Sequence, residues 1–257
     1  MSPGMPLLRL PSEGRGAESW ALRLEAADPL TEAAIGQIDH VVLLLAKVAS
    51  HGGFPAPRSA PPSARMEIGP AHLEARNILV FDVDGNDCDL RGFELLRGMA
   101  ERLVRNDVRI EAIALESKSI APGGRLQLEP TDDTEYEAYP ALSPLIRFPL
   151  VREALDDTKS RRALVDLVTP VRKDEVDRLE EWLRPWFQLL EAGAFALPIG
   201  LPSETDSIAG ATTLFDEQAI EVSINRFQAS ECAWNVLVNM VDACWPDARW
   251  VSQLTIE

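Results

Sequence analysis

Two aspartates separated by one residue have the type and spacing that could do chemistry in this sequence. Asp82 and Asp84 come at the end of a strongly apolar run, residues 77–83, and a glycine follows them. An apolar run of this kind is typical of a central strand buried on both faces. A carboxylate at the end of such a strand can attack phosphorus once a metal ion offsets the negative charge.

Residues 78–86, ILVFDVDGN, resemble the first motif of haloacid-dehalogenase-like phosphatases, an apolar strand followed by D-x-D-G. The resemblance implies a nucleophilic Asp82, a general acid at Asp84, a magnesium ion between phosphate and carboxylates, and a parallel Rossmann-like sheet. The other interpretation, which we favour, is a strand that ends in an Asp-Gly turn. Asp87 or Asp89 would then cap the helix that follows.

The remaining reactive residue types form no pattern that specifies a reaction. His40, His51 and His72 lack the spacing of a metal-binding pair, although His40 lies near an apolar helical stripe that favours a hydrogen-bonded structural role. Cys88, Cys232 and Cys244 are too sparse for a disulfide framework. Nucleophile-elbow, phosphate-loop and dinucleotide-binding motifs are absent from the sequence. We therefore predict a non-enzymatic protein with no cofactor and no metal site.

The charge of the chain favours a protein partner over nucleic acid or membrane. There are 41 acidic residues against 25 lysines and arginines, a net charge of −16. Such a surface repels phosphate backbones and anionic lipids, and it attracts basic proteins. The proline-broken N-terminus does not read as a secretory signal, and the apolar run from His40 to Ser50 is too short to span a bilayer. We expect a cytoplasmic protein.

The pattern of apolar residues predicts two copies of one unit. Strands are expected over 19–26, 66–68, 77–83 and 108–115, and again over 145–151, 162–169, 212–215, 218–225 and 250–256. Helices are expected over 30–50 and 89–105, from Asp174 with a kink or break at Pro185, and from a Ser230 cap. Matching positions are 141 to 144 residues apart: Leu22 with Val165, Ile38 with Trp182, Ile78 with Ile220, and Ile113 with Leu254.

This order predicts an α+β fold of two tandem ferredoxin-like βαββαβ units, each an antiparallel sheet with helices packed on one face. The first unit covers residues 1–117, with a loose arm over 1–16. An acidic, proline-containing linker covers 118–144, and the second unit covers 145–257.

The hypothesis for function is an acidic protein-binding module, most concretely a bacterial immunity or antitoxin-type protein that neutralises a basic toxin domain. The expected contact residues are acidic: Asp84, Asp87, Asp89, Asp132, Asp133, Glu135 and Glu137. Two alternatives are a magnesium-dependent phosphohydrolase that uses Asp82 and Asp84, and a regulatory domain that binds a small molecule between the units. A homodimer is also compatible with the sequence.

Overall fold

The computed structural model describes most of both predicted units. The described residues are 18–55, 65–86, 88, 92–93, 95–96, 99, 110–118, 125–128, 145–153, 160–195, 209–225, 232–245 and 250–257.

Both halves of the chain contain strands and helices among the described residues. The N-terminal half contains β1 (Glu18–Ala26), α1 (Glu32–Ser50), β2 (Arg65–Ile68), β3 (His72–Ala75), β4 (Ile78–Asn86), β5 (Ile110–Ser117) and β6 (Arg125–Leu128). The C-terminal half contains β7 (Leu150–Arg152), β8 (Ser160–Leu167), α3 (Lys173–Glu191), β9 (Ala209–Leu214), β10 (Ala219–Asn225), α4 (Cys232–Cys244) and β11 (Val251–Ile256).

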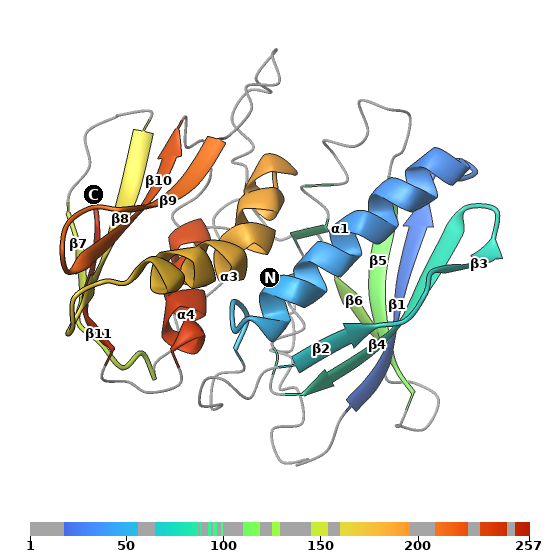
Figure 1. The fold of residues 1–257 in the computed structure, drawn as a ribbon. Coiled ribbons are helices and arrows are strands. Elements are labelled where there is room, and N and C mark those ends of the chain that lie inside the picture. The colour runs from blue at the N-terminus through green and yellow to red at the C-terminus, as the bar shows by residue number, and fades with distance from the viewer. Residues whose placement is uncertain are drawn as a thin grey trace, which may run out of the picture.

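Each half forms a sheet of its own, and the helices lie between the two sheets (Figure 1). The N-terminal sheet has the order β2-β4-β1-β5-β6, and β3 also pairs with β4. The C-terminal sheet has the order β7-β11-β8-β10-β9. Its β7 pairs with β11 in parallel, so this sheet is mixed and not purely antiparallel as predicted. The α+β class is confirmed.

Two strands were not predicted, and the starts of two helices differ from the prediction. β3 is missing from the sequence prediction, and β6 lies inside the predicted linker, where it pairs with β5. Helix α1 begins at Glu32 and not at residue 30, and Thr31 caps it, because its Oγ1 accepts a hydrogen bond from the Ala34 N–H at 3.2 Å. Asp174 lies within the first turn of α3. Pro185 does not interrupt that helix, although its ribbon changes direction along its length (Figure 1).

One spacing relates the two halves throughout. Helices α1 and α3 differ by 141 residue numbers at both ends, 32 against 173 and 50 against 191. Leu24 pairs with Leu79 and Ile113 in the first sheet, and Val165 pairs with Ile220 and Leu254 in the second. The same 141 residues separate the members of these three pairs: 24 from 165, 79 from 220, and 113 from 254.

The ends of the two long helices also correspond. Gly52 and Gly193 both have positive φ, 81° and 79°, in the left-handed conformation that ends a helix. The N–H of Gly52 donates to the Ala49 carbonyl and that of Gly193 to the Leu190 carbonyl, both at 2.9 Å. Glycine is required here because other residues adopt this conformation only at a cost.

Side chains from both halves form one hydrophobic core. Trp186 on α3 and Trp234 on α4 are fully buried, and so are Leu22 and Phe81 of the N-terminal sheet. Helix α1 contacts α3, its equivalent in the other half. Each sheet therefore buries its inner face against helices that the two halves share.

The end of α1 joins the two halves. The His51 ring stacks on Trp182 of α3 with ring centroids 4.0 Å apart, and its Nδ1 lies 2.9 Å from the Trp182 carbonyl oxygen. The Asn239 side chain of α4 donates to the Gly53 carbonyl at 3.3 Å. Burial lowers the pKa of His51, so the neutral imidazole is the form that fits this junction.

Helix α1 is 19 residues long, and by length and composition it is apolar enough to cross a membrane. It is longer than the apolar run from His40 to Ser50 on which the sequence prediction was based. Nine of its residues are buried in this structure, among them Ile38, Val42 and Leu45. It packs against β2 and α3, as a core helix of a globular α+β domain does.

A buried ion pair fixes the segment before β7. The Arg147 guanidinium donates to Asp242 Oδ1 at 3.0 Å and to the Trp245 carbonyl at 3.0 Å. Asp242 is 3% exposed, and burial raises its pKa against the opposing effect of Arg147. Removing one partner would leave a buried charge without compensation, which is more costly than never having the pair.

Replacing Gly52 by alanine should destabilise the fold by about 2–4 kcal/mol, because it combines a left-handed backbone with steric overlap. A Cβ at this position would lie 2.5 Å from the Ala243 Cβ. The matched control is Gly36→Ala in α1, where a Cβ would meet nothing within 4 Å. This substitution should increase the free energy of unfolding by up to about 1 kcal/mol. Urea unfolding measures both, and equal stabilities would contradict the described junction.

The stability of the protein should decrease as the pH falls below the ordinary histidine pKa of about 6.5. His51 has a lowered pKa in the folded chain, so the unfolded chain binds the proton more readily in this range. The contribution of His51 to the stability is therefore fully present above that pH, and it is lost as the pH falls towards the pKa of His51 in the folded chain. Urea unfolding at several pH values should show a flatter profile for His51→Gln than for the wild type. A profile unchanged by the substitution would show that His51 does not cause the decrease.

Candidate functional site

Asp82 and Asp84 lie on the outer face of the N-terminal sheet, opposite the helices. Both side chains are exposed, whereas the intervening Val83 and the preceding Phe81 are fully buried. The predicted Asp-Gly turn is wrong, because β4 continues through Gly85 to Asn86. Pairing with β1 on one side and β2 on the other supplies backbone partners there, so the chain stays extended.

Each aspartate accepts a hydrogen bond from a residue of a neighbouring strand or strand end. Lys118 Nζ donates to Asp82 Oδ1, and Ser19 Oγ donates to Asp84 Oδ1. The Lys118 N–H also donates to the Ser19 carbonyl at 3.0 Å, which places that lysine beside β1. The hydrogen bond from Lys118 lowers the pKa of Asp82, so this carboxylate is ionised at neutral pH.

The strand register brings two further carboxylates to the same face. Glu67 of β2 lies directly opposite Asp84, and Ala21 of β1 lies between Asp82 on one side and Glu116 of β5 on the other. We call these four carboxylates and the small residues between them the acidic face: Glu67, Asp82, Asp84 and Glu116 around Ser19 and Ala21. Small side chains at the centre leave room for a long basic side chain to reach the carboxylates.

The other predicted contact residues cannot be placed on this face. Asp87, Asp89, Asp132, Asp133, Glu135 and Glu137 lie outside the residues that the structure describes. Glu67 and Glu116 were not singled out from the sequence. Alternation within the short segment RMEI was an available signal for Glu67, since Met66 is buried and its neighbour must point outward.

The position of the aspartates differs from what the phosphatase resemblance implies. That resemblance places the motif at the end of a strand in a parallel sheet, where the carboxylates face an open crevice. Here β4 is antiparallel to β1, β2 and β3, and Asp82 and Asp84 lie within paired stretches of the strand. In the described part of the chain, no three His, Cys, Asp or Glu residues are grouped so that they could hold a metal ion.

The histidines and cysteines occupy separate places. His40 is exposed on α1, and His72 is exposed on β3. Cys88 is half-buried, with its Sγ 3.2 Å from the Arg65 carbonyl oxygen. Cys232 and Cys244 are buried in α4, and burial raises the pKa of Cys244 to about 11, which makes it a poor nucleophile.

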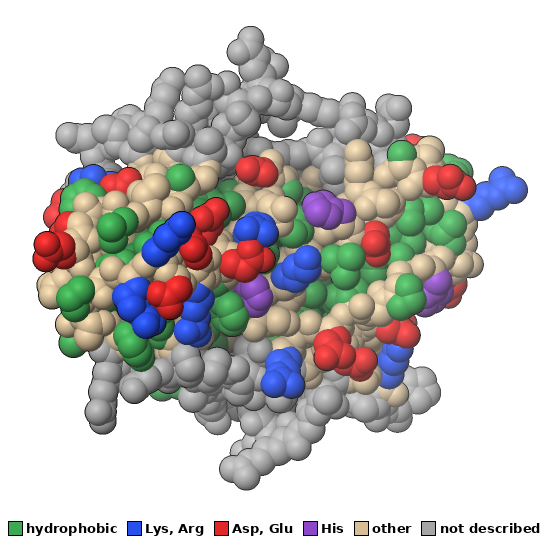
Figure 2. Space-filling model, in the orientation of Figure 1, with side chains coloured by type: hydrophobic (Ala, Val, Ile, Leu, Met, Phe, Trp, Pro, Cys, Tyr) green, Lys and Arg blue, Asp and Glu red, His purple; other side chains and the backbone are tan. Residues whose placement is uncertain are grey.

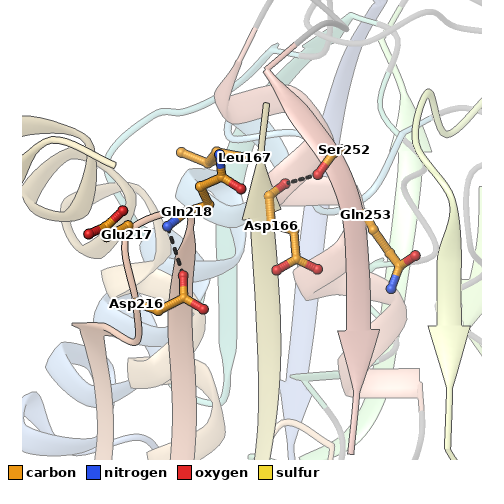
Figure 3. Close-up of a pocket in the computed structure, with 7 residues that line it drawn as sticks. All are labelled: Asp166, Leu167, Asp216, Glu217, Gln218, Ser252 and Gln253. Atoms are coloured by element: carbon orange, nitrogen blue, oxygen red, sulfur yellow. Dashed lines mark hydrogen bonds between the residues drawn. The ribbon is translucent and has the colours of Figure 1, made fainter. Parts of the chain in front are cut away.

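A second group of acidic residues, which the sequence did not suggest, lies at the end of the C-terminal sheet (Figure 3). There Asp166, Asp216 and Glu217 line an open depression of about 720 Å³. Asp216 accepts the N–H groups of Gln218 and Ala219 at 2.7 and 2.8 Å, so it stabilises the turn between β9 and β10. Burial, and then the charge of Asp216, raise the pKa of Asp166.

Comparisons with known proteins do not assign the chain to a family. No protein family and no curated protein matches the sequence. Among solved structures, Cas6 from Thermus thermophilus aligns over 95% of this chain and 100% of its own, at 10% identity and a TM-score of 0.18. Chains at that TM-score do not superpose as one fold, so the match says nothing of function.

Replacing Lys118 by methionine should raise the pKa of Asp82 towards its ordinary value, because the largest cause of the lowering is removed. Carbon-detected NMR titration of the Asp82 carboxyl group measures this change directly. Lys47→Met, at an exposed position in the last turn of α1, is the matched control and should leave that titration as in the wild type. A pKa of Asp82 that stays equally low in both variants would show that Lys118 does not set it.

Proposed function

We propose that this chain is a non-enzymatic protein-binding module whose acidic face binds a basic protein. In its most concrete form it is a bacterial immunity protein that acts in the cytoplasm and neutralises a basic toxin domain. The observation that supports this proposal is the gathering of Glu67, Asp82, Asp84 and Glu116 on one open sheet face of a chain with a net charge of −16.

The arrangement of this face suits recognition by charge. Asp82 and Asp84 already accept hydrogen bonds from Lys118 and Ser19, which hold the carboxylates in place before a partner arrives. Fixed groups lose less conformational freedom on binding than mobile ones. An arginine of the partner can offer two parallel N–H groups to one carboxylate, and the field of the whole chain accelerates the encounter.

We further propose that the two halves are duplicated ferredoxin-like units, with the boundaries 1–117 and 145–257 and a linker over 118–144. The strand orders support this proposal. In the N-terminal sheet β1 lies between β5 and β4, and β2 lies beyond β4. In the C-terminal sheet β8 lies between β11 and β10, and β9 lies beyond β10. The four strands of each half therefore have the same order, with β3, β6 and β7 as additions. The constant 141-residue spacing of helices and strands has its simplest explanation in duplication of one ancestral unit.

The test is binding to the basic proteins encoded beside the gene of this chain, measured by surface plasmon resonance at about 50 mM salt, where charge interactions are screened little. The wild type should retain one of them. The double variant Glu67→Lys, Asp84→Lys should bind at least about tenfold more weakly, mainly through slower association.

The matched control carries the same change in net charge on a different surface. Asp177→Lys with Glu180→Lys alters two exposed positions of α3 and should reduce binding much less. Equal weakening in both double variants would reduce the interaction to non-specific attraction and contradict the acidic face. A magnesium-dependent phosphatase activity that disappears in Asp82→Asn would contradict the non-enzymatic proposal.

A further inference from the structure

We infer that a groove between α1 and the β2–β3 connection receives a large apolar side chain of the basic partner, flanked there by lysine or arginine. This inference rests on the proposed function for the nature of the partner. It adds a second contact, one that depends on shape and burial as well as on charge.

The groove, which we call the α1 groove, has a volume of about 450 Å³. The apolar part of its lining comes from both sides: Ile35 and Leu43 from α1, Ile68 from the end of β2, and Pro70 and Ala71 from the β2–β3 connection. Leu43 is 39% exposed, which is high for a leucine of a core helix. In Figure 2 hydrophobic side chains gather over α1 and the strands beside it, with acidic side chains among them.

Gly36 lies in the lining of the groove, and the fold does not need a glycine there. A Cβ at this position would meet nothing within 4 Å, and its φ lies outside the left-handed region. Glycine inside a helix costs about 1 kcal/mol relative to alanine. A glycine that weakens its own helix and opens space on an exposed face is typical of a site where another molecule approaches closely.

The C-terminal half provides an internal comparison. Residues of α3 that lie 141 positions beyond Gly36, Asp39 and Leu43 are Asp177, Glu180 and Arg184. Asp177, Glu180 and Arg184 are all exposed, so the same fold tolerates charged side chains at these helix positions. The apolar and open character is therefore specific to α1, and packing within the unit does not explain it.

The rim of the groove selects a basic occupant. Glu32, at the start of α1, and Asp39, one turn beyond Gly36, lie beside the apolar lining. A lysine or arginine next to the inserted side chain would meet these carboxylates, whereas an acidic segment would be repelled.

The α1 groove and the acidic face share strand β2, at the edge of the N-terminal sheet. Ile68 lines the groove and its neighbour Glu67 belongs to the acidic face, so strand β2 contributes to both surfaces. The Gly69 N–H donates to the Asp82 carbonyl at 2.8 Å, which ties the groove wall to β4. One partner surface can therefore contact the two sites around the β2 edge of the sheet.

The test uses a defined probe, an acetylated and amidated peptide in which one leucine lies between two arginines. Titrated into the ¹⁵N-labelled full chain, it should shift the amide resonances of Ile35, Gly36, Leu43 and Ile68. A peptide with glycine in place of leucine should bind about tenfold more weakly, because the buried side chain is lost. Gly36→Gln fills the groove with a good helix former and should weaken the leucine peptide to a similar degree.

Asp177→Gln is the matched control, since it makes the same residue at the equivalent helix position and should leave the affinity unchanged. Shifts that map elsewhere, equal binding of the two peptides, or binding unaffected by Gly36→Gln would each overturn the inference. Self-association of the chain that Gly36→Gln abolishes would also overturn it, by making a second copy the occupant. If the wild type and Gly36→Gln retain a basic partner equally, the inference about the groove is overturned and the proposed function stands. If the peptide shifts the resonances of the groove residues but no basic partner is retained, the proposed function is overturned and the groove stands.

Discussion

The burial of helices between two sheets is the constraint on which the rest of this structure depends. An amphipathic sheet must cover one face, and here both sheets cover theirs with the same layer of helices. The helices do not cover the outer faces, so charged side chains such as those of Asp82 and Asp84 are exposed there. Charge can accumulate there without cost to the core. Strand β4 can therefore carry acidic residues on its outer face while the side chains of its inner face are buried.

The correspondence between the halves makes their differences informative. The equivalent positions 54 and 195 are both phenylalanine and both 2% exposed, because each side chain fills the core just beyond the end of a helix. Asp82 and Asp84 correspond to Ser223 and Asn225, and Gly36 corresponds to Asp177. The positions that hold the fold together are alike, while the positions that face outward have diverged, so the N-terminal half carries both proposed contact surfaces.

The sequence predicted most elements but not their exact correspondence. Leu22 was matched with Val165, whereas the sheet register matches Leu24 with Val165, a slip of two residues. Such a slip keeps every side chain on the same face of a strand, so alternation alone cannot detect it. The match of Ile38 with Trp182 is wrong for a related reason, since the equivalent residue is Leu179 and a shift of three positions stays on one helix face. The acidic face depends on pairing between distant strands, which no local pattern contains, and Asp82 and Asp84 were its only members singled out from the sequence.

The contact between α1 and α3 has a consequence for the history of the chain. On the proposed duplication these are equivalent helices, and equivalent surfaces in contact are what a twofold axis produces. A single ancestral unit would have exposed the helix surface that is now buried between α1 and α3, an apolar patch that a monomer seldom leaves in water. On that proposal the precursor was a homodimer whose subunit interface became the interior of one polypeptide. Fusion would then have freed the two copies to diverge, so that one could acquire the proposed contact surfaces that the other lacks.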